Sequence, residues 1–145
     1  MNKKLVKIIV PIILIICLML FYLIQYSNKS FKKLLGIDEL NITKVSMRNG
    51  NNGNLVETSD KVKIEELINL LNNRDYRKSF EQGSRTGYSY YYDFYVGDKH
   101  VLRMIGSGNN VQINSTYYQT SKEISVDSLR EWFNSLPIKS YGALN

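Results

Sequence analysis

One uncharged stretch near the amino terminus constrains this chain more than any other feature. From Ile8 to Ile24 the sequence reads IIVPIILIICLMLFYLI, 17 residues without a charged side chain. Leu5 extends the stretch to about 20 residues if the Lys7 amine reaches back to the headgroups, and roughly 20 apolar residues are what a helix needs to cross a bilayer. We therefore predict a transmembrane anchor over residues 1–27 that contacts the lipid bilayer through residues 5–24.

A cleaved signal peptide is the alternative for this stretch. Its apolar core is only about 7 to 15 residues long and ends in small side chains. Here the run is longer, and bulky residues 23–26 (LIQY) stand where small ones would be needed, which favours an uncleaved signal anchor. Cys17 is the only cysteine, so no intramolecular disulfide can form. Ile16 before it is not the small residue that lipoprotein processing requires.

The distribution of charge bears on orientation and on partners. The net charge is +6, but six lysines stand against two acids before residue 41, and 13 basic residues stand against 11 acidic ones from there on. Most of the excess therefore flanks the apolar run, where anionic headgroups attract it, and no basic stripe for nucleic acid is left. The two flanks nearly balance, but a short basic amino terminus usually stays in the cytoplasm. We expect a single-pass membrane protein whose C-terminal domain lies outside.

Beyond the anchor, the sequence predicts an α+β domain over residues 41–137. Strand patterns and turn signals indicate about five strands, near residues 41–49, 55–57, 88–96, 100–106 and 111–120. Apolar residues at i, i+3, i+4 and i+7 predict two helices, with Ser59 or Asp60 and Ser125 as N-caps. Short connections among the last three strands imply a small antiparallel sheet, with both helices on one face.

Three connecting or terminal segments have open interpretations. Residues 28–40 are predicted to be a juxtamembrane linker, either an amphipathic helix lying on the bilayer or a continuation of the anchor that breaks at Gly36. In the first case Phe31, Leu34 and Leu35 would face one side. Residues 74–87 form a polar, basic loop that either meets an anionic partner or is a solvated connection. Residues 138–145 are predicted to be a loose tail.

The most unusual strand is GYSYYYDFYVG, residues 87–97. Because side chains alternate along a strand, its residues divide into two faces. One face holds Tyr88, Tyr90, Tyr92, Phe94 and Val96, and the other holds Ser89, Tyr91, Asp93 and Tyr95. The first set is too apolar to stay in water, so it should lie under the helices. The second set gives the candidate binding residues: Tyr91, Asp93 and Tyr95.

The turn that follows decides which residues join the candidate binding face. A two-residue turn at Gly97-Asp98 is favoured by its residue types. It would place His100, Leu102 and Met104 beside Tyr91 and Tyr95. A three-residue loop would instead place Arg103 opposite Asp93, because a slip of one residue exchanges the two faces of a strand. We predict the two-residue turn.

The sequence offers little for catalysis. His100 is the only histidine and Cys17 lies in the apolar run, so no pair of nucleophile and base is evident. One histidine with scattered acids is also too few ligands for a metal site. GSGNN, residues 106–110, lacks the rest of a dinucleotide fingerprint and is predicted to be a β-turn. We predict no enzyme, no cofactor and no metal; an enzyme would require a pocket where His100 meets a carboxylate.

Composition indicates the source of the chain. Asn, Ile and Lys are abundant and Ala143 is the single alanine, which is typical of an AT-rich genome. We interpret the chain as coming from a low-GC Gram-positive bacterium. Three segments, TSDKVKIEELINLLNN (58–73), GYSYYYDFYVGDK (87–99) and VQINSTYY (111–118), together resemble a family of uncharacterised extracytoplasmic domains of Firmicutes. The resemblance runs from Ile42 to Leu136, implies an anchored extracytoplasmic domain and supplies no catalytic residues.

These observations lead to an expected role. We expect a membrane-anchored extracytoplasmic domain with a binding or accessory function and no catalysis. Its partner would be a membrane protein, a cell-envelope polymer or an external peptide rather than nucleic acid. The alternative is an immunity or inhibitor protein that blocks a toxin or enzyme near the membrane.

Overall fold

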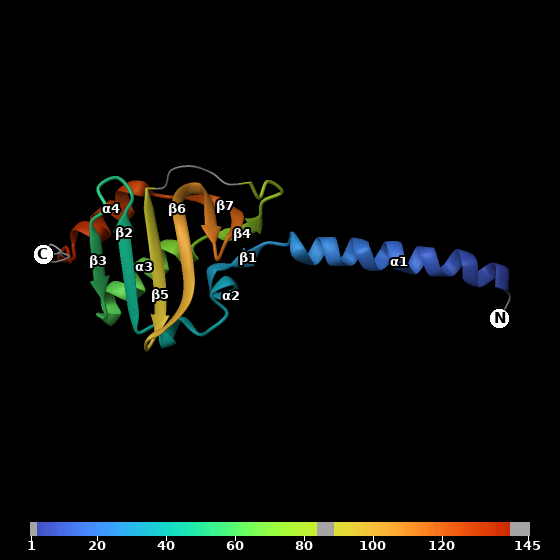
Figure 1. The fold of residues 1–145 in the computed structure, drawn as a ribbon, viewed down its shortest axis with the longest axis horizontal. Helices are drawn as coiled ribbons and strands as arrows, with labels where there is room; N and C mark the ends of the chain where they lie inside the picture. Colours follow the sequence, from blue (N-terminus) through green and yellow to red (C-terminus); the bar gives the residue numbers. More distant parts are fainter. Residues whose placement is uncertain (1–2, 84–88, 140–145) are drawn as a thin grey trace, which may run out of the picture.

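A computed structural model describes residues 3–83 and 89–139, with side chains from Lys7 onward. The apolar run forms α1 (Lys3–Gln25), which projects away from a folded domain (Figure 1). Within the described residues, α1 is the one helix long and apolar enough to cross a membrane. Its segment Lys7–Gln25 has a mean hydropathy of 2.9, and none of that segment is buried in the protein. The prediction of an N-terminal apolar helix of membrane-spanning length is confirmed.

The predicted α+β fold is also confirmed, with a larger sheet than about five strands. In the part of the chain that the structure describes, the sheet has seven antiparallel strands in the order β1-β4-β7-β6-β5-β2-β3. They are β1 (Lys29–Ser30), β2 (Lys44–Asn49), β3 (Leu55–Thr58), β4 (Asp75–Lys78), β5 (Tyr90–Val96), β6 (Lys99–Ile113) and β7 (Thr116–Ile124). The two unpredicted strands, β1 and β4, have two and four residues, too few to show a clear alternation, and β4 lies inside the segment 74–87 predicted to be a loop. The predicted strand 111–120 is also corrected, because a turn at Asn114 and Ser115 divides it between the end of β6 and the start of β7.

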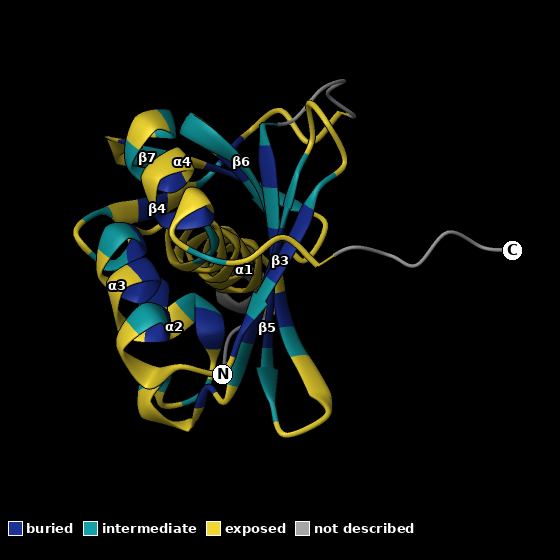
Figure 2. Ribbon diagram, turned by 90° about the vertical axis from the view of Figure 1, so that its left-hand side faces the viewer, coloured by how far each residue is buried: buried dark blue, intermediate teal, exposed yellow. Residues whose placement is uncertain are grey.

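The helices form a second layer on one face of this sheet. They are α2 (Phe31–Leu35), α3 (Lys61–Asn72) and α4 (Val126–Asn134), with a short 3-10 turn η1 (Glu39–Asn41) after α2. Figure 2 shows all three α-helices on the same side, and none of the described residues forms a helix on the opposite side of the sheet. Asp60 and Ser125 cap α3 and α4, because their side-chain oxygens accept hydrogen bonds from the Val62 and Ser128 amides. These caps satisfy backbone donors that a helix start otherwise leaves unpaired.

The segment predicted to be a linker, residues 28–40, contributes to the domain. β1 pairs with β4, and Phe31 and Leu35 of α2 are buried in the core. The Phe31 ring lies 5.6 Å from that of Phe94 and 6.0 Å from that of Tyr76. The apolar side of this segment therefore packs against the sheet instead of lying on the bilayer.

The first residues of the predicted tail also have partners. Ile138 forms an antiparallel bridge with Val56 of β3, and the Lys139 amide donates a hydrogen bond of 2.8 Å to the Leu55 carbonyl. This short pairing covers part of the β3 edge of the sheet, where unpaired backbone groups would otherwise be exposed. The rest of the predicted tail lies outside the described residues.

Candidate functional site

The two faces of β5 divide as the sequence predicts. Tyr90, Tyr92 and Phe94 are buried under the helices, whereas Tyr91 and Tyr95 are half-buried on the other side. Tyr88 lies outside the described residues. The Tyr92 hydroxyl donates a 2.6 Å hydrogen bond to the Gly106 carbonyl, which satisfies the polar end of a side chain with no exposed surface. Burial raises the pKa of the Tyr92 phenol far above its ordinary value, so it stays neutral.

The side chains of Tyr91 and Tyr95 lie on a sheet surface that we call the open face. It comprises the outward-pointing residues of β2, β5 and the first half of β6, on the side of the sheet opposite to α2, α3 and α4 (Figure 2). Strand pairing sets its neighbours, because Lys44 lies opposite Tyr95, Ser46 opposite Asp93 and Arg48 opposite Tyr91. The alternation of β2 therefore adds two cations to the candidate site, which an inspection of the β5 sequence alone does not reveal.

Asp93 lies at the centre of the open face but is only 3% exposed. Arg103 binds it through two parallel hydrogen bonds, Nε to Oδ1 at 2.7 Å and Nη2 to Oδ2 at 2.9 Å. His100 adds a third contact, Nε2 to Oδ1 at 2.7 Å. Two-pronged arginine–carboxylate pairs are among the stronger and more directional polar contacts in proteins. Asp93 therefore holds Arg103 and His100 in place, and its own oxygens have little capacity left for a ligand.

The register of the β5–β6 hairpin combines both alternatives considered from the sequence. Val96 pairs with Lys99 across the predicted two-residue turn, and Tyr95 pairs with His100. The register then shifts, so that Phe94 pairs with Leu102 and Asp93 with Arg103. Val101 is therefore an extra residue in β6 and forms a bulge. After this bulge, each side chain of β6 points to the opposite face from the one that an unbroken two-residue-turn register would give.

This bulge corrects the prediction for two residues. Leu102 and Met104 were predicted to lie beside Tyr91 and Tyr95, but both are fully buried in the core. His100, which precedes the bulge, stays on the open face as predicted. Arg103 reaches the position opposite Asp93 that the three-residue loop would have given it.

β6 bends back on itself at the predicted GSGNN turn. Gly106 and Gly108 have φ values of 109° and 72°, a region that favours glycine. After the bend, the Asn114 amide donates to the Arg103 carbonyl, and the Arg103 amide donates to Asn114 Oδ1, both at 2.9 Å. The two halves of β6 thus lie side by side. Residues of both halves, with the two that follow β6, line a cavity of about 420 Å³: His100, Arg103, Ile105, Gln112, Asn114 and Ser115.

Both tyrosines of the open face lie next to cations. The Arg103 guanidinium lies 5.1 Å from the centre of the Tyr91 ring, and that of Arg48 lies 6.0 Å from it. The Lys44 amine is 4.4 Å from the centre of the Tyr95 ring, where an aromatic face attracts a cation. The hydrogen bond to Asp93 raises the pKa of Arg103, which keeps this guanidinium protonated. The open face is therefore aromatic and cationic.

The side chains of the open face are better suited to binding a ligand than to cleaving a bond. His100 does meet a carboxylate beside a cavity, which is the minimum that an enzyme would need. In the described part of the chain, however, His100 hydrogen-bonds to Asp93 alone, and no hydroxyl or thiol is paired with it for activation. Among those same residues, no three His, Cys, Asp or Glu side chains gather closely enough to hold a metal ion.

Comparisons with protein-family models, with curated proteins and with solved structures find no match to this chain.

Proposed function

We propose that this chain is a membrane-anchored, non-catalytic binding domain whose open face receives an anionic partner on the outer side of a bacterial membrane. The observation that carries the proposal is the gathering of Lys44, Arg48 and Arg103 around Tyr91 and Tyr95. Among the described residues, no helix lies over this surface, and two hydrogen bonds to Asp93 hold Arg103 in place.

The chemistry of the open face supports an anionic partner. Arg103 uses Nε and Nη2 for Asp93 and still presents its exposed outer edge. Guanidinium groups recognise phosphate and carboxylate through paired hydrogen bonds. Tyr91 and Tyr95 add rigid contact area at a low cost in conformational entropy. A phosphate-bearing envelope polymer and an acidic segment of a neighbouring membrane protein share this chemistry.

The proposed location of the domain, outside the membrane, rests on α1 and on the lysines that precede its apolar segment. α1 is long and apolar enough to span a membrane, and the lysines before it favour a cytoplasmic amino terminus. The domain would then face the cell wall of a Gram-positive bacterium, in keeping with the resemblance to extracytoplasmic domains of Firmicutes. There it would act as an accessory factor that keeps its partner close to the membrane.

Photocrosslinking in intact cells tests this proposal. A photoreactive phenylalanine analogue at Tyr95 should capture a specific partner, and the same group at Glu131, on the exposed side of α4, should not. A double substitution, Lys44→Gln with Arg48→Gln, should reduce capture from Tyr95 several-fold, and added salt should do the same because exposed charges are screened. Equal capture from Tyr95 and Glu131, or capture insensitive to both changes, would contradict binding at the open face.

An immunity or inhibitor protein is the alternative function. Its hallmark is a phenotype, because deletion of the gene would make cells sensitive to a toxin or deregulate an enzyme at the membrane. If Tyr95 captures such a protein and deletion gives that sensitivity, the open face is an inhibitory surface. A captured polymer without any such phenotype supports the accessory binding role.

A further inference from the structure

An aromatic stack joins the anchor to the domain. Tyr22 lies in the last turn of α1 and Tyr26 directly follows the helix. Their ring centroids are 4.7 Å apart, and the Phe80 ring, just beyond β4, lies 4.6 Å from Tyr26 and 6.2 Å from Tyr22. Phe80 thus contacts the end of the apolar helix although it belongs to a distant part of the sequence.

Phe80 is an unusual residue to leave on a surface. Its side chain is 62% exposed despite the stack. Two cations of β4 accompany it, since the Arg77 guanidinium is 5.9 Å from the Phe80 ring and the Lys78 amine is 5.9 Å from the Tyr26 ring. A third cation, Lys29, lies on β1, which pairs with β4 and follows α1 closely. Exposed aromatic rings beside lysine and arginine are typical of the membrane–water interface.

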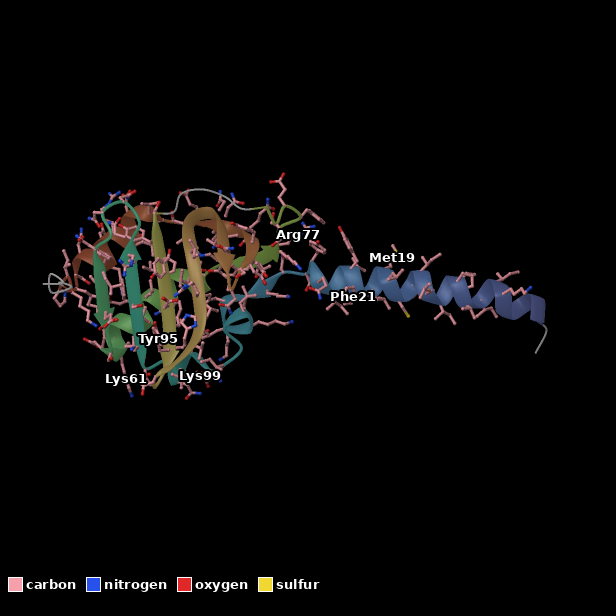
Figure 3. The ribbon with its side chains drawn as sticks, viewed as in Figure 1. Met19, Phe21, Lys61, Arg77, Tyr95 and Lys99 are labelled. Atoms are coloured by element: carbon pink, nitrogen blue, oxygen red, sulfur yellow. The ribbon has the colours of Figure 1, made fainter. Side chains whose placement is uncertain are left out.

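The position of α1 places this group at that interface. If α1 spans the bilayer, its last turn lies at the level of the headgroups, and Phe80 stacks on that turn. Figure 3 shows Arg77 beside the end of α1, whereas Lys61 and Lys99 lie at the lower end of the domain, away from α1. Figure 1 shows that α1 leaves the domain next to β1 and β4, with β3 at the opposite edge of the sheet.

We infer that Lys29, Arg77, Lys78 and Phe80 form a docking edge that binds anionic phospholipid headgroups of the bilayer in which α1 is anchored. Phe80 inserts at the interface, and the three cations attract the headgroup phosphates. The inference rests on the proposed membrane anchorage. Docking in this way would place the β1–β4 edge of the sheet on the membrane, with the strands parallel to the membrane plane. The open face would then point sideways, toward partners in the same layer of the envelope.

Depth-dependent quenching in nanodiscs tests the docking edge in the full chain. Cys17→Ser removes the native thiol, and Gly83→Cys introduces a fluorophore site next to the edge, where a Cβ meets nothing within 4 Å. A second chain carries the label at Asn51, in the exposed turn between β2 and β3. We expect lipids brominated close to the headgroup to quench the label at position 83 and not at position 51. Phosphatidylglycerol should strengthen that quenching.

Substitutions separate the contributions of charge and ring. Arg77→Gln with Lys78→Gln should weaken the docking equilibrium roughly fivefold for each cation removed, and Phe80→Ser should also reduce the quenching. Lys61→Gln with Lys99→Gln removes the same charge far from α1 and should change nothing. Circular dichroism of each variant verifies that these exposed substitutions leave the fold intact.

The possible failures are distinguishable. A chain that does not float with lipid vesicles contradicts the membrane anchorage, and the docking edge with it. A chain that floats but shows no quenching at position 83 overturns the docking edge and leaves the anchorage standing. Quenching that ignores both phosphatidylglycerol and the loss of Arg77 and Lys78 overturns the role of anionic headgroups.

Discussion

The structure changes the interpretation of Asp93 from a ligand-binding residue to one that positions its neighbours. By strand alternation it points to the candidate binding face, where a carboxylate next to tyrosines suggests direct contact with a ligand. The structure instead gives it three hydrogen bonds, two from Arg103 and one from His100. A charged group buried to this degree is tolerated because it is paired. Asp93 therefore positions the cations that face solvent.

Removing that charge should destabilise the domain measurably. In Asp93→Asn, Arg103 keeps at most one of its two charge-assisted hydrogen bonds, and the loss should lower the free energy of unfolding by about 1–3 kcal/mol. Urea unfolding of the full chain in detergent micelles measures this change. Asp98→Asn, in the exposed turn of the same hairpin, is the matched control and should shift stability by less than about 0.5 kcal/mol. Equal effects would show that Asp93 does not organise the open face.

The buried phenols of Tyr76 and Tyr92 make the stability of the domain depend on pH in the alkaline range. Burial raises the pKa of both Tyr76 and Tyr92, whose hydroxyls donate to the Leu71 and Gly106 carbonyls. In the unfolded chain these groups lose their protons near pH 10. The unfolded state then binds fewer protons than the folded state, so their stabilising contribution is complete below about pH 10 and declines above it.

Tyr92→Phe should flatten this dependence. The variant has one buried ionisable group fewer, so its free energy of unfolding should fall less steeply than that of the wild type above about pH 10. At neutral pH it should be about 1 kcal/mol less stable, because the Gly106 carbonyl loses its donor. Chemical unfolding at a series of pH values measures both effects. Parallel curves for the two proteins would contradict the assignment to Tyr92.

At the scale of elements, β6 contains the irregularities that shape the candidate site. The bulge at Val101 moves Arg103 opposite Asp93, and the bend at Gly106 and Gly108 brings Asn114 against Arg103. The bend was predictable, because GSGNN is rich in turn residues. The bulge was not predictable, because whether an extra residue in a strand is stable depends on how the strands on both sides pack against it.

A series of glycine substitutions tests the bend. Gly106→Ala should be the most damaging, because its φ of 109° is unfavourable for alanine and its Cβ would lie 3.1 Å from the Asn110 carbonyl oxygen. A cost of about 1–3 kcal/mol is expected. Gly108→Ala, with φ at 72° and open space around it, should cost about 1 kcal/mol. Gly83→Ala, with neither constraint, should be neutral or slightly stabilising. Thermal unfolding that does not follow this order would refute the role of the bend.

At the scale of the whole molecule, the folded domain begins directly after α1. Residues 28–40 are predicted from the sequence to be a juxtamembrane linker, but β1 extends the sheet and the Phe31 ring packs between those of Tyr76 and Phe94. This continuity places β1 and β4, and with them the proposed docking edge, next to the end of α1.

Truncation tests this boundary. A chain beginning at Asn41 lacks β1 and α2 and leaves a cavity where Phe31 packs, a loss of roughly 3–5 kcal/mol for the ring alone. Because domains are stable by only about 5–15 kcal/mol, we expect no cooperative urea transition for this chain. A chain beginning at Ser27 should unfold cooperatively. Near-ultraviolet circular dichroism, which reports on the packing of the buried Trp132, measures the difference. Equal cooperativity of the two chains would contradict the boundary at β1.

The sequence by itself determined the features that depend on local pattern. The apolar run fixes α1, because a helix of this length must find an apolar environment. Spacing of apolar residues fixes the inner faces of α3 and α4, and alternation along β5 separates Tyr90, Tyr92 and Phe94 from Tyr91 and Tyr95. Each of these patterns repeats within one element, so it can be recognised without knowing what lies beside that element.

Only the tertiary structure decided which residues meet across elements. Short strands such as β1 and β4 exist because neighbouring strands complete their hydrogen bonds, not because their own sequences favour extension. The bulge at Val101 gives Asp93 its partners, and the pairing of β2 with β5 brings Lys44 and Arg48 to the tyrosines. The stack of Phe80 on Tyr26 likewise joins segments that are distant along the chain. These contacts arise from register and packing, which depend on the balance of burial and hydrogen bonding over the whole sheet.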